Sequence, residues 1–350
     1  MRERESRHFN DESTSTRGPI MDYKDKELVQ YYFDQLKKLA QKDHCIFIKF
    51  DPAIHVNDYD SKSYNINKYK DTELYLDTFK SCKAIHHGYT MSIADTVQPR
   101  FQSNVYSYEN IDETLPKHTK RLIKDADRRN VQIIHGHLEL LDDFSRLVEL
   151  TESRKGVALR DKGYFKTLLE NYLNGGVIFL AMCNVYQLNK EAKIKKVKLE
   201  KEIAQTCENA KKKLHRLEDQ LRSVDNDIKE FKEILSEFGQ EDKDIAIAGI
   251  LSVQYGNTCE MLYAGMDERF KKLMPQYKEY VENFKWAFER GCSWSNMGGV
   301  EGSLDDGLTK FKDNFNPTIN EFIGEFDIPV YPFMYRLTQK AYKILKSKHM

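Results

Sequence analysis

The sequence predicts an α/β or α+β fold into which a long helical hairpin is inserted. Short apolar runs alternate with stretches of helical spacing on both sides of residues 188–239, which is typical of a mixed fold. From Ile203 to Phe238 the apolar residues recur at alternating intervals of about four and three residues, the heptad seam of a coiled coil. Neither Pro nor Gly interrupts this seam before Gly239. We therefore expect a globular body that carries a charged helical arm.

The composition is that of an ordinary globular protein. The chain has 350 residues, enough for two domains of ~100–200 residues each. Lys plus Arg and Asp plus Glu number 55 each, so a polyanion must be met by local basic patches rather than by a net positive field. Six scattered Cys without a CxxC pair indicate a reducing compartment. The chain shows no signal peptide and no apolar run near the ~20 residues that span a bilayer, so we expect a cytoplasmic protein.

Helical spacing and short apolar runs give the order of elements around the arm. Residues 1–17 are polar and aperiodic, which predicts a disordered lead-in. Before the arm, the predicted helices are 25–41, 113–129, 138–153 and 161–173, and the predicted strands are 45–48, 131–134 and 177–183. Beyond it, the predicted strands are 245–253 and 259–264, and the predicted helices are 267–290 and 333–346, separated by a Gly-rich stretch at 298–307.

The arm is expected to be an antiparallel hairpin that turns near residues 206–209, because one chain cannot leave and return along a single helix. A continuous helix is the alternative. Lys residues crowd the first part of the arm, and acidic residues dominate after Glu218. A basic arm, like the basic predicted helix from Lys117 to Arg129, is either a solvated surface or a surface that contacts phosphates.

No short motif defines a reaction by itself. Residues 302–309 are close to a phosphate-binding loop, but Leu308 stands where the lysine is required and two preceding Asp would repel phosphate.

His135 and His137 share one face of a predicted strand. No further ligand stands at metal-site spacing, so a structural pair is the better interpretation. We expect no metal site.

Several longer segments carry a family pattern. The most specific are LTESRKGVALRDKGYF at 150–165, MLYAG at 261–265 and GLTKFK at 307–312. Further matches lie at 17–29, 47–52, 96–100 and 113–116. Together they resemble the Fem family of aminoacyl-tRNA-dependent transferases, over essentially residues 17–340. The arm lies where the lipid-II-modifying members with a coiled-coil arm carry theirs.

The resemblance implies two domains of the acetyltransferase-like GNAT fold, with the arm inserted in the second. The expected domains are 18–135, then 136–187 together with 240–350, and the arm is 188–239. The family's first domain normally begins well before the match at Gly18-Pro19. We therefore expect a first domain that is truncated at its N-terminus, with an exposed sheet edge or an incomplete core.

The resemblance also implies a reaction. The amine of the stem-peptide lysine of a peptidoglycan precursor, or of the growing branch, attacks the ester carbonyl of an aminoacyl-tRNA and forms an amide. The ester is already activated, so the enzyme must mainly align its substrates and stabilise the developing oxyanion. The expected partners are aminoacyl-tRNA and either lipid II, which the arm favours, or UDP-MurNAc-pentapeptide. No cofactor is expected, because the aminoacyl-tRNA is a co-substrate. Contact with the inner face of the membrane would be peripheral, through lipid II.

The family pattern assigns roles to individual residues. Lys312 matches the residue at the oxyanion and is the catalytic candidate. Arg160 and Tyr164 match the pair that contacts the diphosphate and sugar of the precursor, and their separation of four residues would put both on one helix face. The remaining substrate-binding candidates are Tyr263, Phe311 and Arg100.

Two other functions remain as alternatives. An acyl-CoA-dependent N-acetyltransferase would share the implied fold, but the Gly-rich pyrophosphate loop that enters a helix is missing. A non-catalytic interaction protein would use the coiled coil and would not need Lys312, Arg160 and Tyr164 in one cleft. For the transferase, the expected amino acid is glycine, alanine or serine.

Overall fold

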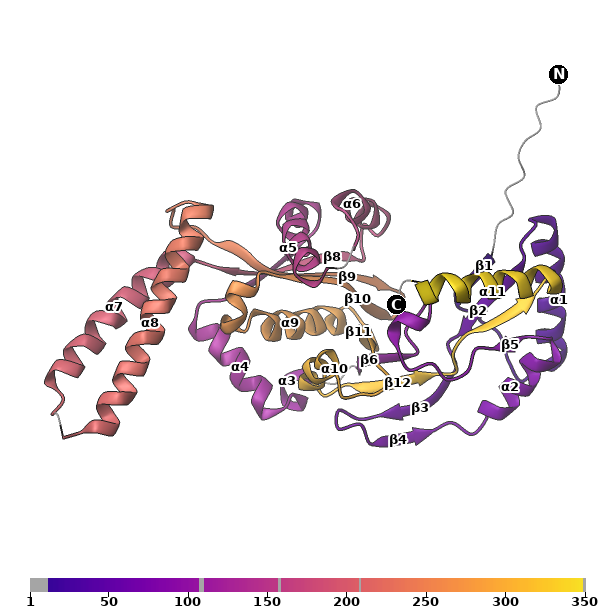
Figure 1. Ribbon diagram of the computed structural model, residues 1–350, viewed down its shortest axis with the longest axis horizontal. Coiled ribbons are helices and arrows are strands. Elements are labelled where there is room, and N and C mark those ends of the chain that lie inside the picture. The colour runs from indigo at the N-terminus through magenta and orange to yellow at the C-terminus, as the bar shows by residue number, and fades with distance from the viewer. Residues whose placement is uncertain (1–11, 107–109, 157–158, 208, 349–350) are drawn as a thin grey trace, which may run out of the picture. The chain divides into compact units, whose positions relative to one another are not determined.

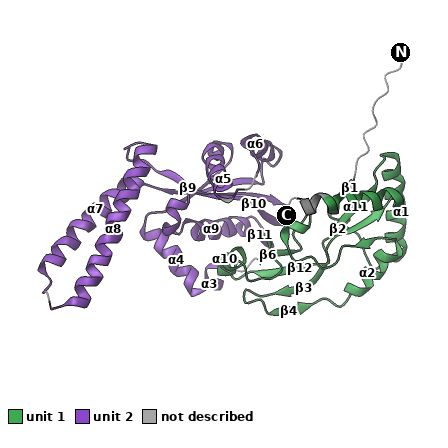
Figure 2. Ribbon diagram, in the orientation of Figure 1, with its two compact units in different colours: residues 1–106, 296–350 green, residues 107–295 purple. Residues whose placement is uncertain are grey.

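The structure is a computed structural model that describes residues 12–106, 110–156, 159–207 and 209–348 (Figure 1). The chain divides into two compact units, which Figure 2 distinguishes by colour. Unit 1 comprises residues 1–106 and 296–350, and unit 2 comprises residues 107–295. The units differ in extent from the expected domains, because residues 107–135 belong to unit 2 and residues 296–350 to unit 1.

Unit 1 contains a four-stranded sheet with the order β1-β2-β13-β5. Its strands are β1 (Glu12–Arg17), β2 (Phe47–Pro52), β13 (Phe326–Pro329) and β5 (Ile85–His86). Side chains of β2 alternate between two faces. Ile48 and Phe50 pack on α1 (Lys26–Lys42) and α2 (Thr72–Ser81), whereas Phe47 packs on α11 (Pro332–Lys348). Helices therefore cover both faces of this sheet.

Residues 12–17 form strand β1, so the expectation of disorder is wrong for this segment; residues 1–11 lie outside the described residues. β1 pairs in parallel with β2. The backbone N–H of Arg17 donates to Oδ1 of Asp51 at 2.6 Å, and the two side chains form an ion pair at 3.8 Å. The strand is rich in Ser and Thr and has no apolar alternation, so its backbone pairing leaves no periodic signal in the sequence.

The other strands of unit 1 run in the order β4-β3-β12-β6-β11. They are β4 (Asn65–Lys68), β3 (His55–Tyr59), β12 (Thr318–Phe322), β6 (Phe101–Tyr106) and β11 (Trp294–Val300), and the division between the units falls within β11. Phe101, Val300 and Ile319 form a small core on these strands. The connecting helices are η1 (Ile93–Asp95), α10 (Gly307–Lys312) and η4 (Asp313–Phe315).

The strands of unit 2 run in the order β10-β9-β8-β7, with every neighbouring pair antiparallel. They are β10 (Thr258–Met266), β9 (Ile245–Tyr255), β8 (Gly176–Cys183) and β7 (Gln132–Gly136). Helices α5 (Leu141–Lys155) and α6 (Lys162–Asn171) lie on one face, and α9 (Pro275–Glu289) lies on the other (Figure 1). Since both faces are covered, residues 245–253 are buried without alternation.

The arm is an antiparallel hairpin, as expected. It consists of α7 (Val185–Gln205) and α8 (Lys211–Phe238), which pack side by side (Figure 1). The chain leaves the sheet at the end of β8 and returns at the start of β9, where Cys183 and Ile245 are paired. The distal part of the hairpin has its own apolar cluster, formed by Leu199, Leu217, Val224 and Ile228. The base joins the core of unit 2 through Val185, Leu188, Phe231, Ile234 and Leu235.

Two predicted helices are interrupted in the structure. Residues 268–273 form η3 (Glu268–Leu273), and Met274 adopts a left-handed conformation (φ 57°) before Pro275 starts α9. The helix expected at 113–129 is split into α3 (Ile111–Thr114) and α4 (Lys117–Arg128), because the residue before Pro116 is extended. The segment expected as helix 138–153 starts with η2 (Leu138–Leu140) and continues as α5. The other predicted elements are confirmed, with ends that differ by a few residues.

Among the described residues, no helix combines the length and the apolar character needed to cross a bilayer.

Candidate active site

A guanidinium group and two phenol groups gather in unit 2 at the start of α6. The Asp161 side chain accepts a hydrogen bond from the backbone N–H of Tyr164 at 2.8 Å and caps the helix. The guanidinium carbon of Arg160 lies 5.1 Å from the centre of the Tyr164 ring. The Tyr164 ring meets the Tyr263 ring edge to face, with 6.1 Å between centroids. Residues from two distant segments thus form one cluster.

Arg160 does not lie on the helix that carries Tyr164. α6 begins at Lys162, and its N-cap Asp161 has an extended backbone (φ −82°, ψ 170°). The expectation that Arg160 and Tyr164 share a helix face is therefore wrong. The reason is the strong preference of Asp for the N-cap position, which starts the helix at Lys162, two residues after Arg160. The cation–π contact, rather than helical spacing, brings the two side chains together.

Tyr263 is directed into this cluster by an irregularity in β10. The pairing of β10 with β9 shifts register between Met261 and Tyr263, and such a bulge turns a side chain away from its regular position. Burial raises the pKa of Tyr263, the neighbouring Tyr164 raises it further, and Arg160 partly opposes them. Tyr263 is therefore a protonated hydrogen-bond donor at neutral pH. A guanidinium fork beside phenol donors suits phosphate oxygens and sugar hydroxyls.

Lys312 is buried at the end of α10 in unit 1. Asp306 is the N-cap of the helix, and its carboxylate accepts a hydrogen bond from the N–H of Leu308 at 2.7 Å. The Lys312 side chain runs inward, so that the residue is 3% exposed and its Nζ donates to the carbonyl oxygen of Gly299 at 2.8 Å. A Cβ atom on Gly298, where φ is 85°, would lie 3.7 Å from this Nζ. With so little water around it, this amine in its protonated form would act strongly on negative charge that forms beside it.

Phe311 and Asp313 flank this lysine in the sequence. Phe311 is partly buried, and its ring meets the edge of the Phe315 ring at 5.5 Å. Sequence reasoning missed Asp313. Burial, followed by the charges of Asp306 and Asp60, raises the pKa of its carboxyl to about 6. Because the burial and the Asp60 charge depend on tertiary structure, the local sequence gives no signal for this shift.

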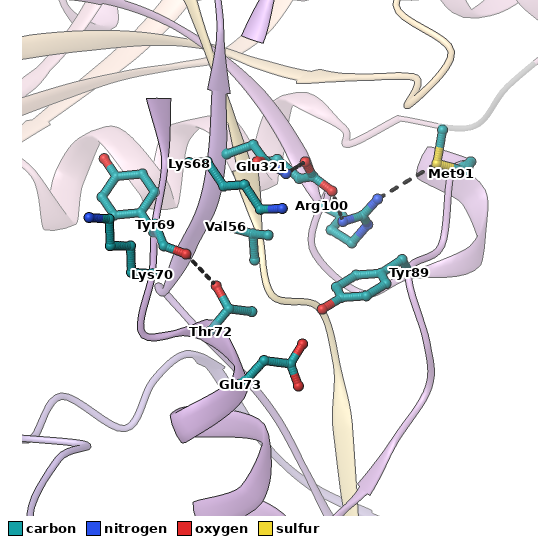
Figure 3. Close-up of a pocket in the computed structure, with 11 residues that line it drawn as sticks. Val56, Lys68, Tyr69, Lys70, Thr72, Glu73, Tyr89, Met91, Arg100 and Glu321 are labelled. Atoms are coloured by element: carbon teal, nitrogen blue, oxygen red, sulfur yellow. Dashed lines mark hydrogen bonds and ion pairs between the residues drawn. The ribbon is translucent and has the colours of Figure 1, made fainter. Parts of the chain in front are cut away.

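Arg100 lies in a different part of unit 1, at a pocket of about 640 Å³ (Figure 3). It is 5% exposed, and it donates from Nη1 to Oε1 of Glu321 at 2.5 Å and from Nε to the carbonyl oxygen of Thr90 at 2.6 Å. Lys68 and Tyr89 point toward the same space. These two hydrogen bonds hold Glu321 and the loop at Thr90 in position, and a role of Arg100 in substrate binding stays a prediction.

A buried polar network in β3, β6 and β12 was also missed. Asn320 accepts from Nδ2 of Asn104 at 2.5 Å and from the Tyr106 hydroxyl at 3.2 Å, and it donates to Oδ1 of Asp58 at 2.7 Å. Such a network fixes the register of β12, whose next residue is Glu321. The available signal was the polar pair Asn320-Glu321 between the apolar residues Ile319 and Phe322.

The candidates expected from the sequence therefore fall into three groups. Arg160, Tyr164 and Tyr263 are in mutual contact in unit 2. Lys312 and Phe311 are adjacent on α10 in unit 1, and Arg100 lines the pocket of the same unit. The convergence of all six on one cleft stays a prediction.

Comparisons with known proteins point in one direction. A model of the FemAB family matches residues 3–343. The aminoacyltransferase FemA of Staphylococcus aureus (strain bovine RF122 / ET3-1) is 27% identical, with 95% of this chain and 82% of that protein covered. An aminoacyltransferase FemA of Staphylococcus epidermidis is 26% identical, with 95% and 83% covered. A crystal structure of FemX has a TM-score of 0.68 and 22% identity, with 93% of this chain and 82% of that chain covered.

The likeness to the FemX structure shows that the chain has that fold, which confirms the mixed α/β class expected from the sequence. The family model spans nearly the whole chain. The chain therefore belongs to the FemAB family and is an aminoacyltransferase. This confirms the resemblance noted in the sequence and excludes the non-catalytic interaction protein.

Proposed function

We propose that this aminoacyltransferase moves an amino acid from aminoacyl-tRNA to a peptidoglycan precursor. The acceptor is the side-chain amine of the stem-peptide lysine, or of the growing branch, and the product is an interpeptide bridge. Membership of the FemAB family supports the proposal. The observation that carries it is the buried amine of Lys312, which hydrogen-bonds the Gly299 carbonyl. Aminoacyl-tRNA is cytoplasmic and the precursor is accessible from the cytoplasm, so the enzyme would act there.

The proposed step is a simple acyl transfer. The neutral amine nitrogen attacks the ester carbonyl of the aminoacyl-tRNA, and the C–N bond of the new amide forms. The C–O bond of the ester breaks, and the terminal ribose hydroxyl of the tRNA leaves with the proton that the amine gives up. Negative charge develops on the carbonyl oxygen in between, and a fixed cation at that point stabilises the transition state more than the ground state.

Lys312 suits this role because its position is fixed before the reaction. The side chain is buried, and one of its N–H groups is held by a backbone carbonyl. An ammonium group has three donors, and the bond to Gly299 fixes the direction of one of them. In surroundings of low polarity, its interaction with an oxyanion is much stronger than it would be in water.

The Arg160–Tyr164–Tyr263 cluster is proposed to bind the diphosphate and sugar of the precursor. The planar guanidinium can donate two parallel hydrogen bonds to a phosphate, and the two phenols lie beside it. Lipid II and the UDP-linked precursor both contain a diphosphate, so this cluster fits either. We favour lipid II, because the chain has the helical arm of the lipid-II-modifying members.

The arm is proposed to contact the tRNA backbone. α7 contains six Lys and three Glu, and it is the more basic of the two helices. Lys198 and Lys201 are exposed on its surface. Exposed lysines that neutralise phosphates give affinity without sequence specificity. Such binding suits this enzyme, because the arm would only hold the tRNA backbone while the reaction takes place at the end of the tRNA.

The test is transfer of label from a mixture of radiolabelled Gly-, Ala- and Ser-tRNA to lipid II. Purified wild type is compared with Lys312→Met, which keeps the side-chain volume but removes the charge, and with Lys312→Ala. We expect label in the lipid fraction with wild type and a loss of ~10²–10³ in rate with both variants. Lys310→Ala is the matched control, because Lys310 is exposed on the same short helix.

Three outcomes contradict the proposal. One is transfer by Lys312→Met at the rate of wild type. Another is an equal loss with Lys310→Ala, which would indicate a general effect on α10. A third is acyl transfer from acetyl-CoA with no transfer from aminoacyl-tRNA, which would point to the acetyltransferase alternative. Thermal unfolding of each variant separates loss of function from loss of folding.

A further inference from the structure

The helix α11 is fixed on unit 1 through one of its faces. Tyr335 is buried, its ring meets the Phe47 ring at 5.4 Å, and its hydroxyl donates to Oδ2 of Asp327 at 3.0 Å. One turn later, Gln339 donates to the same oxygen at 3.5 Å. Asp327 is fully buried and also forms an ion pair with Lys49 at 3.1 Å. These contacts set the rotation of α11 about its own axis.

The opposite face of α11 is apolar and exposed. Phe333 is 72% exposed, Leu337 is 47% exposed and Ile344 is 58% exposed. At ~100° per residue these three positions fall within an arc of roughly 40°. Tyr335 lies roughly 180° away from the middle of that arc. The apolar stripe is therefore directed away from the body of unit 1 by the contacts that anchor the helix.

The same stripe is accompanied by positive charge. Lys340 follows Phe333 by seven residues and lies roughly 20° from it around the helix. Arg336 lies farther toward one side, and both cations are exposed. The segment 328–350 contains five basic residues and no Asp or Glu: Arg336, Lys340, Lys343, Lys346 and Lys348. The chain as a whole has no net charge, so this is a local concentration of positive charge.

From this combination we infer that α11 docks on the surface of an anionic lipid bilayer. The helix would lie parallel to the membrane, with Phe333, Leu337 and Ile344 in the boundary between headgroups and acyl chains. Arg336 and Lys340 would extend to the lipid phosphates, since long basic side chains keep their stems in apolar surroundings and their charges in the headgroup layer. Apolar burial and electrostatic attraction to anionic lipids then act together.

The position of Lys340 favours a membrane over a protein partner. It lies at the edge of the apolar stripe, between Leu337 and Ile344 along the helix, and Lys is depleted from the buried centre of protein–protein interfaces. A bilayer accepts such a residue, because its headgroup layer offers water and phosphate directly above the apolar layer. A second copy of the chain would instead have to bury the like charges of two facing helices.

The experiment measures binding of the full chain to vesicles of phosphatidylcholine, with and without phosphatidylglycerol. The vesicles contain neither precursor nor tRNA, so the result is independent of the proposed transfer reaction. We expect wild type to bind the anionic vesicles and to be released by salt. The double variant Phe333→Ser/Leu337→Ser should lower the partition coefficient about tenfold or more. Arg336→Glu/Lys340→Glu should abolish the preference for anionic lipid.

Two matched controls lie on α1. Tyr31→Ser/Leu39→Ser removes a similar amount of exposed apolar surface, and Lys38→Glu/Lys42→Glu reverses two exposed cations at the same spacing as Arg336 and Lys340. Both should bind like wild type. The inference is overturned if wild type does not prefer anionic vesicles, or if the α11 variants bind as wild type does. It is also overturned if sedimentation velocity shows a wild-type dimer that Phe333→Ser/Leu337→Ser dissociates, because the stripe would then be a self-association surface.

Discussion

Arg160 and Tyr164 meet through a cation and a ring face rather than through a shared helix face. The guanidinium carbon is 5.1 Å from the ring centre, although Arg160 precedes the N-cap of the helix that carries Tyr164. The stacked ring limits the orientations of the guanidinium and so prepares its donors for a ligand. Binding of the precursor should therefore depend on the planar guanidinium group of Arg160, with its parallel N–H donors, and not on its charge alone.

Replacing Arg160 by Lys is expected to raise KM for the precursor about tenfold, which is ~1.4 kcal/mol, with little change in kcat. Lys keeps the charge but can neither stack in the same way nor donate two parallel hydrogen bonds. Steady-state kinetics with saturating aminoacyl-tRNA measure the effect. Lys162→Gln, an exposed cation two residues away that pairs with Asp142, is the control. A lower kcat at unchanged KM would speak against a binding role for Arg160.

Exposed lysines of α7 are expected to contribute to tRNA affinity. Lys198→Gln/Lys201→Gln should weaken binding and flatten the dependence of log K on log salt by ~0.7–0.9 for each phosphate contact that is lost. Lys229→Gln/Lys232→Gln removes two exposed lysines at the same spacing on α8, and it should have a smaller effect. Fluorescence anisotropy with labelled tRNA across a salt series measures both. Equal slopes for all three proteins would remove the arm from the tRNA site.

Gly265→Ala is expected to destabilise unit 2. A Cβ atom at Gly265 would lie 2.6 Å from the backbone carbon and oxygen of Leu147 on α5. The strand and the helix would have to move apart, at a cost of ~1–3 kcal/mol. Urea unfolding should show a lower midpoint. Gly307→Ala, where nothing lies within 4 Å of the added atom, should leave the midpoint unchanged or slightly higher; a similar decrease in both variants would refute the close-approach explanation.

Asp313 is expected to make the folded state less stable as pH rises through about 6. Its pKa is raised to about 6, first by burial and then by Asp306 and Asp60, whereas an unfolded Asp titrates near ~3.9. The folded chain therefore binds the extra proton between these values, so stability falls as pH rises across this window. Asp313→Asn should raise Tm relative to wild type at neutral pH, but not below about pH 4. Asp305→Asn, an exposed neighbour, should raise Tm at neither pH.

The arm and the buried strands were predictable because their signals are periodic or continuous. The heptad seam from Ile203 to Phe238 requires a partner helix, and the hairpin of α7 and α8 supplies it. The apolar run at 245–253 has no alternation, because helices cover both faces of β9. In both cases the pattern of apolar residues in the sequence follows directly from which side chains are buried.

Features that depend on a single residue or a distant partner were missed. Met274 takes a left-handed conformation and divides the segment predicted as one helix. β1 has no apolar pattern and is held by backbone pairing to β2. The contact between Tyr164 and Tyr263 was not predictable, because a bulge in β10 supplies the second ring. The roles of Arg160, Tyr164 and Lys312 came from family motifs, not from any rule of spacing.

The base and the distal half of the hairpin arm are held by different apolar clusters. Its base shares the core of unit 2 through Phe231 and Leu235, whereas its distal half is held by its own small cluster around Leu199 and Leu217. Opening of the distal half would therefore leave the core of unit 2 intact, because the buried residues of that half lie outside this core. If the arm binds tRNA as proposed, its distal half could move with the tRNA while the base of the arm stays fixed in the core of unit 2.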